Sequence, residues 1–414
     1  MVDLDGRNLG GRNPGGRNPG HRTVRRRTLA ALAVSTLAAP RVVSAQARDP
    51  GPAVKAAIAR FAELPGASCA VVADTKEPWT AGYNGSERRF VGSALKTFIL
   101  ARYLRDVEED KRTLAEQLAV NDRHRTLNSP VFLELTGTTT ATSVLEAMIT
   151  HSDNSATDIA MAAVEVGRVR ALIREAGLRH TEIADSMRKM FCYLAGLAAT
   201  LDSGWPGVKE LVDHPPNPRP ALNDVMTMAS TAEDMIVWYS QALASGYFKT
   251  PAMLAEFRRI QAMATALPQV VPTGIVAYGK GGSIDWQGFH CLSLPGQMIV
   301  GKTAVNFCFT INWTGPDKDV PDMMKTYVDR VARVLEASAA VDGADRVDPA
   351  PRDRQHPQAP AALPLIGGGE ETCSEHCSWP AFVPPLSSAS QPWRKRRTCR
   401  WRAWIAARPT RQPS

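Results

Sequence analysis

Segments with the pattern of β-strands occur near both ends of the central part of this chain, and the stretch between them is mainly helical. Apolar and β-branched residues are concentrated at 67–83 and again at 274–313, as in strands bounded by turns. Residues 111–246 follow a helical period, except in the proline-rich segment 202–222, where regular helix is not expected. Strands from both ends that share one core predict an antiparallel five-stranded sheet packed with helices. The expected fold is α/β, of the α+β kind, with an all-helical subdomain.

Turn and capping residues define the expected elements more closely. Residues 67–74 and 79–83 flank a turn-like segment and predict a β-hairpin. Ser230 and Glu233 fit a capping box ahead of a helix over 235–244. The other expected elements are strands at 274–280, 288–294 and 305–313 and an amphipathic helix over about 323–340.

The N-terminal end differs in composition from the centre. Residues 1–22 repeat Gly, Arg and Asn and cannot bury apolar surface. Arginines at 25–27 precede an uncharged stretch at 29–40 and small residues at 43–47, which together predict a secretory signal of the twin-arginine type. An apolar stretch of about twelve residues is too short to span a bilayer. We therefore expect export, to the periplasm or outside the cell.

Three parts of the chain follow from these compositional changes. Residues 1–47 are expected to be a disordered n-region and signal peptide, 48–341 the globular domain, and 342–414 a disordered Pro- and Arg-rich tail. The formal charge of +8 comes largely from arginines in the two end segments, so we expect no nucleic-acid partner. No stretch of the mature chain is expected to span a membrane, and we expect a monomer.

The cysteines and histidines do not indicate a metal or cofactor. The chain has seven cysteines, an odd number, so at least one is unpaired unless the protein dimerises through it. Cys69, Cys291 and Cys308 lie in strand-like runs and are expected to be small core residues. No Cys/His spacing suits zinc, and His151 has no evident partner. We therefore expect no metal and no cofactor.

A serine and a lysine lie three residues apart at the start of a helical segment. Gly92 provides a turn before Ser93, and the spacing places Lys96 on the same helix face, within reach of the Ser93 hydroxyl. A lysine whose pKa is lowered by burial and nearby positive charge can accept the serine proton. N–H groups at the helix start suit an oxyanion. Alone, such a pair is more often part of a solvated helix face.

Two further motifs follow in order along the chain. The tripeptide Ser-Asp-Asn at 152–154 lies between two helical segments and by itself is typical of a helix cap. The tetrapeptide Lys-Gly-Gly-Ser at 280–283 follows a strand-like run and by itself is typical of a turn. Together with the Ser93 segment, these motifs resemble S-x-x-K, S-D-N and K-T-G of class A β-lactamases and penicillin-binding proteins.

The resemblance to this penicillin-recognising serine hydrolase family extends over about residues 67–340. It implies a β-lactamase/transpeptidase-like fold and hydrolysis of a β-lactam or a related amide through an acyl-serine, with a role in antibiotic resistance. It also implies that Ser93 is the nucleophile and Lys96 its base or proton relay. By the same resemblance, Ser152 passes a proton to the departing nitrogen, helped by Lys280.

The resemblance also implies which residues bind the substrate. Asn154 orients the side-chain amide of the substrate, and Lys280 supplies positive charge for its carboxylate. Gly282 and Ser283 belong to the segment that contacts the substrate. The backbone N–H groups of Ser93 and Ser283 would form the oxyanion hole.

Two positions depart from the family pattern. Gly281 stands where the family has Thr or Ser, and Ser283 is the nearest hydroxyl that can replace it. Met187 aligns with the glutamate that activates the deacylating water, and Phe191 with the asparagine of the same motif. A methionine cannot accept a proton, so we expect Ser93 to be acylated and the acyl group to leave slowly.

Three functions are compatible with these residues. The first is a β-lactamase-like hydrolase, for which Glu182 or Asp185 can replace the missing glutamate only after a rearrangement of the loop. The second is a D-Ala-D-Ala peptidase or esterase of the penicillin-binding type, acting on a peptidoglycan-type substrate. The third is a non-catalytic domain that binds a cell-wall fragment or a partner, although such a domain has little need of both lysines.

Overall fold

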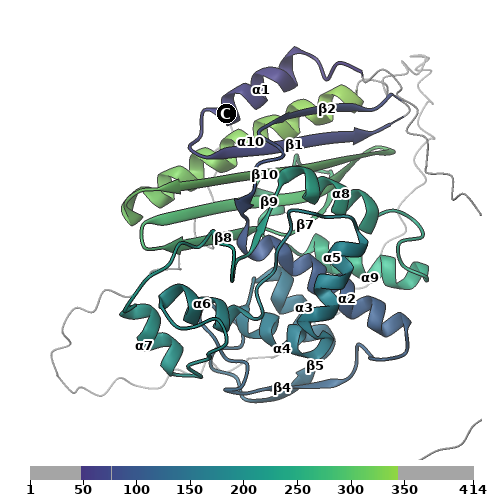
Figure 1. Cartoon of the computed structure of the whole chain (residues 1–414). Coiled ribbons are helices and arrows are strands. Elements are labelled where there is room, and N and C mark those ends of the chain that lie inside the picture. Colours follow the sequence, from purple (N-terminus) through teal and green to yellow (C-terminus); the bar gives the residue numbers. More distant parts are fainter. Residues whose placement is uncertain (1–47, 76, 344–414) are drawn as a thin grey trace, which may run out of the picture. The chain divides into compact units, whose positions relative to one another are not determined.

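The computed structural model describes residues 48–75 and 77–343. The predicted signal peptide (1–47) and residues 344–414 of the predicted C-terminal tail lie outside these residues, whereas residues 342 and 343, predicted as the start of the tail, belong to the last helix. One large sheet organises the fold (Figure 1), with strand order β2-β1-β10-β9-β7 and β8 also paired with β9. Its strands are β1 (Ala67–Asp74), β2 (Trp79–Tyr83), β7 (Val276–Gly279), β8 (Gly282–Trp286), β9 (Phe289–Val300) and β10 (Thr303–Thr314).

Every pairing in this sheet is antiparallel, and strands from both chain ends meet at its centre. Ala67 of β1 pairs with Ile311 of β10. β7 and β8 pair with successive parts of β9, so that they share the fifth position of the sheet. The predicted antiparallel sheet is thereby confirmed, but it has six strands and not the five that were predicted. The prediction for 274–286 was incomplete, because the glycine-rich segment that was read as a turn contains the start of a further strand, β8.

Helices cover both faces of the sheet. Helices α1 (Pro52–Ala62) and α10 (Val320–Gly343) pack against each other and against the sheet (Figure 1), and α8 (Ala232–Ala242) packs against β1, β9 and β10. The sequence prediction missed α1, although Val54, Ile58 and Phe61 recur at helical spacing and form its buried face. Phe61 makes an edge-to-face contact with Phe309 of β10, with ring centroids 5.2 Å apart.

The middle of the chain is mostly helical, as predicted. Its helices are α2 (Lys96–Glu108), α3 (Ala141–Thr150), α4 (Asn154–Val164), α5 (Val166–Glu175), α6 (Met187–Ala195), α7 (Gly207–Asp213) and α9 (Pro251–Ala262). It also contains short strands that were not predicted: β4 (Gln117–Val120) pairs with β5 (Gly137–Thr140), and β6 (Ala229–Ser230) pairs with β3 (Arg89–Phe90). The subdomain is therefore not entirely helical.

Two local predictions are corrected by the structure. α7 forms a short helix inside the proline-rich segment, because its residues lie between Pro206 and Pro215 and contain no proline. The cap of α8 is Thr231, whose side chain accepts a hydrogen bond from the backbone N–H of Asp234. The predicted capping pair was thus displaced by one residue.

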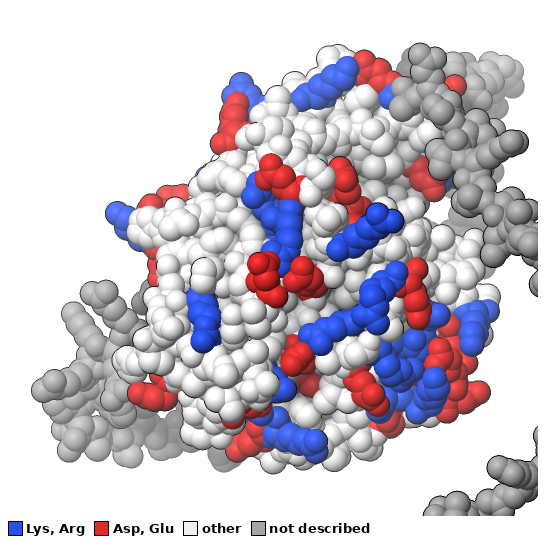
Figure 2. Space-filling model, viewed as in Figure 1, with Lys and Arg blue, Asp and Glu red and all other residues white. Residues whose placement is uncertain are grey.

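The burial of the cysteines agrees with their predicted role. Cys69, Cys291 and Cys308 lie in strands of the large sheet, and all three are buried free thiols. Within 48–75 and 77–343, no group of three or more His, Cys, Asp or Glu side chains could hold a metal ion. None of the helices in these ranges has the length and apolarity needed to cross a bilayer. On the face shown in Figure 2, acidic and basic side chains are interspersed.

The α1 contact gives the first prediction. Phe61→Ala removes a fully buried ring from the interface between α1 and the sheet, so the free energy of unfolding should fall by about 3 to 5 kcal/mol. Val237→Ala, at a helix position 41% exposed, should change it by less than about 0.5 kcal/mol. Urea unfolding followed by circular dichroism measures both. Equal effects would mean that α1 does not contribute to the cooperative core.

Candidate active site

Ser93 lies in a single turn of 3-10 helix between a short strand and α2. The turn spans Gly92–Leu95, and α2 begins at Lys96. Gly92 has a φ of 53°, a left-handed conformation that glycine adopts without strain. Ser93 was predicted in the first turn of the helix itself, whereas the structure places it just before the first α-helical residue. Ser93 is largely buried, with 9% of the residue exposed.

Lys96 connects this turn to the Ser-Asp-Asn segment. Its side chain is fully buried, and Nζ donates to the carbonyl oxygen of Ser152 at 2.6 Å and to Oδ1 of Asn154 at 2.8 Å. Nζ also lies 3.3 Å from Ser152 Oγ. Among the described residues, Lys96 makes no hydrogen bond to the Ser93 hydroxyl. The predicted direct contact is absent because Ser152 and Asn154 engage the amine instead.

Asp153 fixes the geometry of the Ser-Asp-Asn segment. It is the N-cap of α4, and its Oδ1 accepts from the backbone N–H of Ala156. Its Oδ2 accepts from the N–H groups of Val131 and Phe132, both at 2.9 Å. The segment is therefore both the helix cap that its composition suggested and the partner of Lys96.

The Lys-Gly-Gly-Ser segment reaches the same turn from the edge of the sheet. A Cβ atom at Gly282 would lie 2.0 Å from the carbonyl oxygen of Val91 and 3.0 Å from the backbone nitrogen of Ser93. Only glycine permits this approach of β8 to the serine turn. The next residue, Ser283, has its backbone nitrogen 3.3 Å from the Cβ position of Gly92. The backbone N–H groups of Ser93 and Ser283 therefore belong to two segments in direct contact.

Both lysines have a lowered pKa. Burial lowers the pKa of Lys280 to about 7, and its Nζ donates to the Gly281 carbonyl oxygen at 2.6 Å. Burial also lowers the pKa of Lys96 well below its usual value, and the positive charge of Lys280 adds to this effect. The negative charges of Asp153 and Asp158 oppose it. A neutral amine in this place can accept a proton near neutral pH.

The carboxylates in the loop before α6 form ion pairs with arginines and do not interact with Lys96. Met187 is the first residue of α6 and its side chain is buried, as is that of Phe191. Glu182 forms an ion pair with Arg88 at 2.9 Å, and Asp185 one with Arg170 at 2.7 Å. Neither carboxylate is among the charges that shift the pKa of Lys96.

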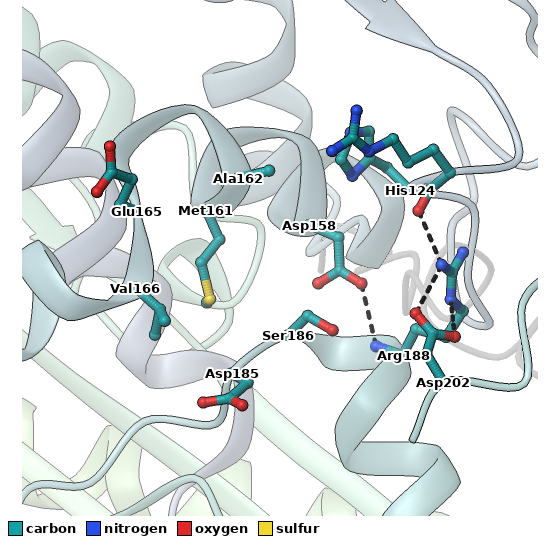
Figure 3. A pocket seen from close by; sticks show the side chains of 11 residues that line it. His124, Asp158, Met161, Ala162, Glu165, Val166, Asp185, Ser186, Arg188 and Asp202 are labelled. Carbon is teal, nitrogen blue, oxygen red and sulfur yellow. Dashed lines mark hydrogen bonds and ion pairs between the residues drawn. The ribbon is translucent and has the colours of Figure 1, made fainter. Parts of the chain in front are cut away.

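Asp158 is a buried carboxylate that the sequence analysis missed. It accepts from the backbone N–H groups of Met187 at 2.6 Å and Arg188 at 3.0 Å. It also faces a cavity of about 290 Å³ between α4 and α6 (Figure 3). The spacing of four residues from Asn154 places the two on one side of α4, and this was the only signal in the sequence.

The sequence profile of the beta-lactamase enzyme family matches residues 52–291. No curated protein matches the chain. PBP-A has a similar structure, with 16% identity and a TM-score of 0.53, covering 69% of this chain and 95% of its own. One solved structure is a PBP-A mutant as an acyl-enzyme complex with penicillin G.

Two further solved structures are β-lactamases by name. The enzyme from Sphaerobacter thermophilus has 18% identity and a TM-score of 0.53, covering 70% of this chain and 97% of its own. The class A β-lactamase of the last common ancestor of Gram-negative bacteria has 18% identity and a TM-score of 0.53, covering 69% of this chain and 99% of its own. At these identities the structures establish the fold alone. Because the family profile covers more than half of the chain, the protein belongs to the beta-lactamase enzyme family, the group of penicillin-recognising serine hydrolases.

Proposed function

We propose that this protein is a serine hydrolase that forms an acyl-enzyme with a β-lactam or a related amide. One observation carries the proposal: a buried amine, Lys96, is bonded to Ser152 and Asn154, while β8 touches the turn that holds Ser93. A helix cap or a glycine turn alone does not require a buried lysine of lowered pKa.

Acylation then proceeds by proton transfer within this cluster. Lys96 makes no hydrogen bond to Ser93 in the structure, and the proposed reaction has neutral Lys96 approach Ser93 Oγ in the substrate complex and accept its proton as Oγ attacks the carbonyl carbon of the amide. The electron pair of the carbon–nitrogen bond goes to the nitrogen as that bond breaks. Ser152 Oγ, 3.3 Å from Lys96 Nζ, donates its proton to the nitrogen and receives the proton held by Lys96. Ser93 is left as an ester.

Backbone N–H groups and Lys280 stabilise the negative charges. The N–H groups of Ser93 and Ser283 face the developing oxyanion, and one such donor is worth about 3 kcal/mol of barrier. Gly282 makes this pairing possible because it lets β8 approach the serine turn. Lys280 attracts the substrate carboxylate, whose negative charge raises the pKa of this lysine and keeps it protonated. Nδ2 of Asn154 donates one N–H to the carbonyl oxygen of Leu127 at 3.0 Å, and its other N–H is left to bind the side-chain amide of the substrate.

The deacylation step lacks its usual base. Met187 occupies the start of α6 with a buried thioether, and Glu182 and Asp185 are held by arginines. Water at the ester is therefore activated poorly. This favours, as a second candidate, a penicillin-binding peptidase or esterase, in keeping with the likeness to PBP-A and its acyl-enzyme complex.

We also propose that the protein is exported by the twin-arginine route. The arginines at 25–27 and the uncharged stretch after them support a twin-arginine signal peptide. A periplasmic or extracellular location suits a peptidoglycan-type or β-lactam substrate.

The first functional prediction concerns Ser93. Fluorescent penicillin should label the full chain covalently, and the label should persist for many minutes because no base activates water. Ser93→Ala should abolish labelling, whereas Ser245→Ala, at an exposed serine, should leave it unchanged. Gel fluorescence over time measures both. Labelling of the Ser93→Ala variant would show that the nucleophile is another residue, and rapid loss of label from wild type would refute slow deacylation.

The second functional prediction concerns Met187. Met187→Glu supplies a proton acceptor at the start of α6 and should speed loss of the label by about tenfold or more. Met187→Gln has the same shape and cannot take up a proton, so it should behave as wild type does. Both variants are checked by thermal unfolding, because they place a polar group in a buried site. Equal rates for Glu and Gln would mean that this position does not face the ester.

The third functional prediction concerns export of the protein. When the full gene is expressed with its own N-terminus, cleavage should follow Ala45 or Ala47, which N-terminal mass spectrometry detects. Replacing Arg25 and Arg26 by lysine should block cleavage if the twin-arginine route is used. A retained N-terminus in the wild-type protein would contradict the proposed signal peptide.

A further inference from the structure

Arg188, the second residue of α6, is a buried arginine that the proposed mechanism leaves unused. It is 7% exposed, and all five N–H groups of its guanidinium donate hydrogen bonds. Nε and Nη2 donate to the two carboxylate oxygens of Asp202, at 2.7 and 2.8 Å (Figure 3). The other three N–H groups donate to backbone carbonyl oxygens, those of Asp122 at 2.8 Å, Arg125 at 3.0 Å and Arg123 at 2.8 Å. The planar guanidinium therefore holds these groups in one fixed arrangement.

The three carbonyl oxygens belong to one segment, residues 121–128, which follows strand β4 and has no helix or strand of its own. Within 48–75 and 77–343, no backbone N–H donates to any of the three. Buried carbonyl groups need a donor, and Arg188 supplies it. One side chain of α6 thus attaches the 121–128 segment to the helix.

The 121–128 segment also contacts Asn154 of the candidate site. Nδ2 of Asn154 donates to the carbonyl oxygen of Leu127 at 3.0 Å, and its backbone N–H donates to that of Asn128 at 3.2 Å. Oδ1 of Asn154 accepts from Lys96 Nζ at 2.8 Å. The Leu127 bond fixes the direction of the amide, because a flipped amide would turn Oδ1 toward a carbonyl oxygen and Nδ2 toward the amine. The position of the segment therefore determines where the second N–H of Asn154 points.

We propose that Arg188 is a positioning residue that acts through the 121–128 segment to aim the second N–H of Asn154 at the side-chain amide of the substrate. The protein should therefore favour β-lactams that carry such an amide. The inference rests on the proposed function, in which Asn154 binds this group. Arg188 does not contact the substrate, since Asp202 and the three carbonyl oxygens use all of its N–H groups.

Other hydrogen bonds keep the segment beside α4 when Arg188 is replaced. The backbone N–H of Thr126 donates to Ser155 Oγ at 3.0 Å, and Ser129 Oγ lies 2.7 Å from the same oxygen. Loss of the guanidinium should therefore loosen the segment without unfolding the site. The steps of acylation that do not involve the substrate side chain should change little.

The test compares acylation by two β-lactams that differ in the side-chain amide. Benzylpenicillin carries this amide, whereas 6-aminopenicillanic acid has the same ring and carboxylate with a free amine in its place. Intact-protein mass spectrometry of the full chain gives the second-order rate constant of acylation by each. In Arg188→Ala the constant for benzylpenicillin should fall by about tenfold and that for 6-aminopenicillanic acid by less than about twofold, because only the first compound uses the Asn154 hydrogen bond. The ratio of the two constants is the readout.

Two further variants separate geometry from charge and from loss of a buried arginine. Arg102→Ala is the matched control, because Arg102 is also 7% exposed and donates to Asp106 and Glu109 rather than to the 121–128 segment. It should keep the wild-type ratio. Arg188→Lys retains the charge, but one ammonium cannot form all five bonds, so its ratio should fall as in Arg188→Ala.

The outcomes distinguish the inference from the proposed function. If neither compound acylates the wild-type chain, the proposed function fails and the inference fails with it. If the wild type is acylated and Arg188→Ala keeps its ratio, or loses both constants equally, the inference alone is overturned. Thermal unfolding checks that each variant is folded.

A milder variant keeps the inference testable if Arg188→Ala does not fold. The side chain of Asp202 is 30% exposed, so Asp202→Asn disturbs the fold less while it removes the charged acceptor that orients the guanidinium. The ratio should fall in the same direction. An unchanged ratio in this folded variant would overturn the inference.

Discussion

The buried amine of Lys96 is the constraint on which the arrangement of the site depends. An amine without water must find polar partners or lose several kcal/mol, and Lys96 finds them in Ser152 and Asn154. These bonds tie α2 to the start of α4. α2 is buried along almost its whole length, so its first residue is held firmly. The serine turn, which leads into α2, is thereby fixed relative to the Ser-Asp-Asn segment.

The sheet imposes the second constraint on the same turn. Asn312 of β10 accepts from the backbone N–H of Phe90 and donates to its carbonyl oxygen, both at 2.9 Å. β8 closes on the turn from the other side through Gly282. The nucleophile is thus held between a central strand and an edge segment of one sheet. Rigid support of this kind is what preorganised oxyanion donors require.

Sequence patterns predicted those helices and strands in which apolar residues recur at regular spacing or form a long run. The five positions of the sheet were predicted because long runs such as β9 and β10 are buried on both faces. The short pairs β4–β5 and β3–β6 have too few residues to show any period. β8 was read as a turn because its first residue, Gly282, has no side chain to contribute to a strand pattern.

The residues of the candidate site also fall into those that the sequence predicted and those that it did not. The three motifs were recognisable because their residue types and order are specific, and the fold brings them together. The contact between Lys96 and Ser93 was predicted from helical spacing alone. In the structure the Lys96 amine donates instead to Ser152 and Asn154, which belong to another segment. Asp158 carries no motif: a single aspartate within a helix looks like a solvated residue until α6 is seen to cover it. Tertiary partners of this kind cannot be read from local sequence.

The pairing of β1 with β10 has a consequence for synthesis of the protein. Ala67 leaves the ribosome long before Ile311, its partner in the sheet, has been made. β2 follows β1 directly and can cover one edge of it, but the edge of β1 that faces β10 stays without its partner through most of translation, a condition that favours aggregation and chaperone binding. A nascent chain arrested before β10 lacks the strand that joins β1 to β9, and it also lacks the hydrogen bonds of Asn312 to Phe90 beside the turn of the nucleophile.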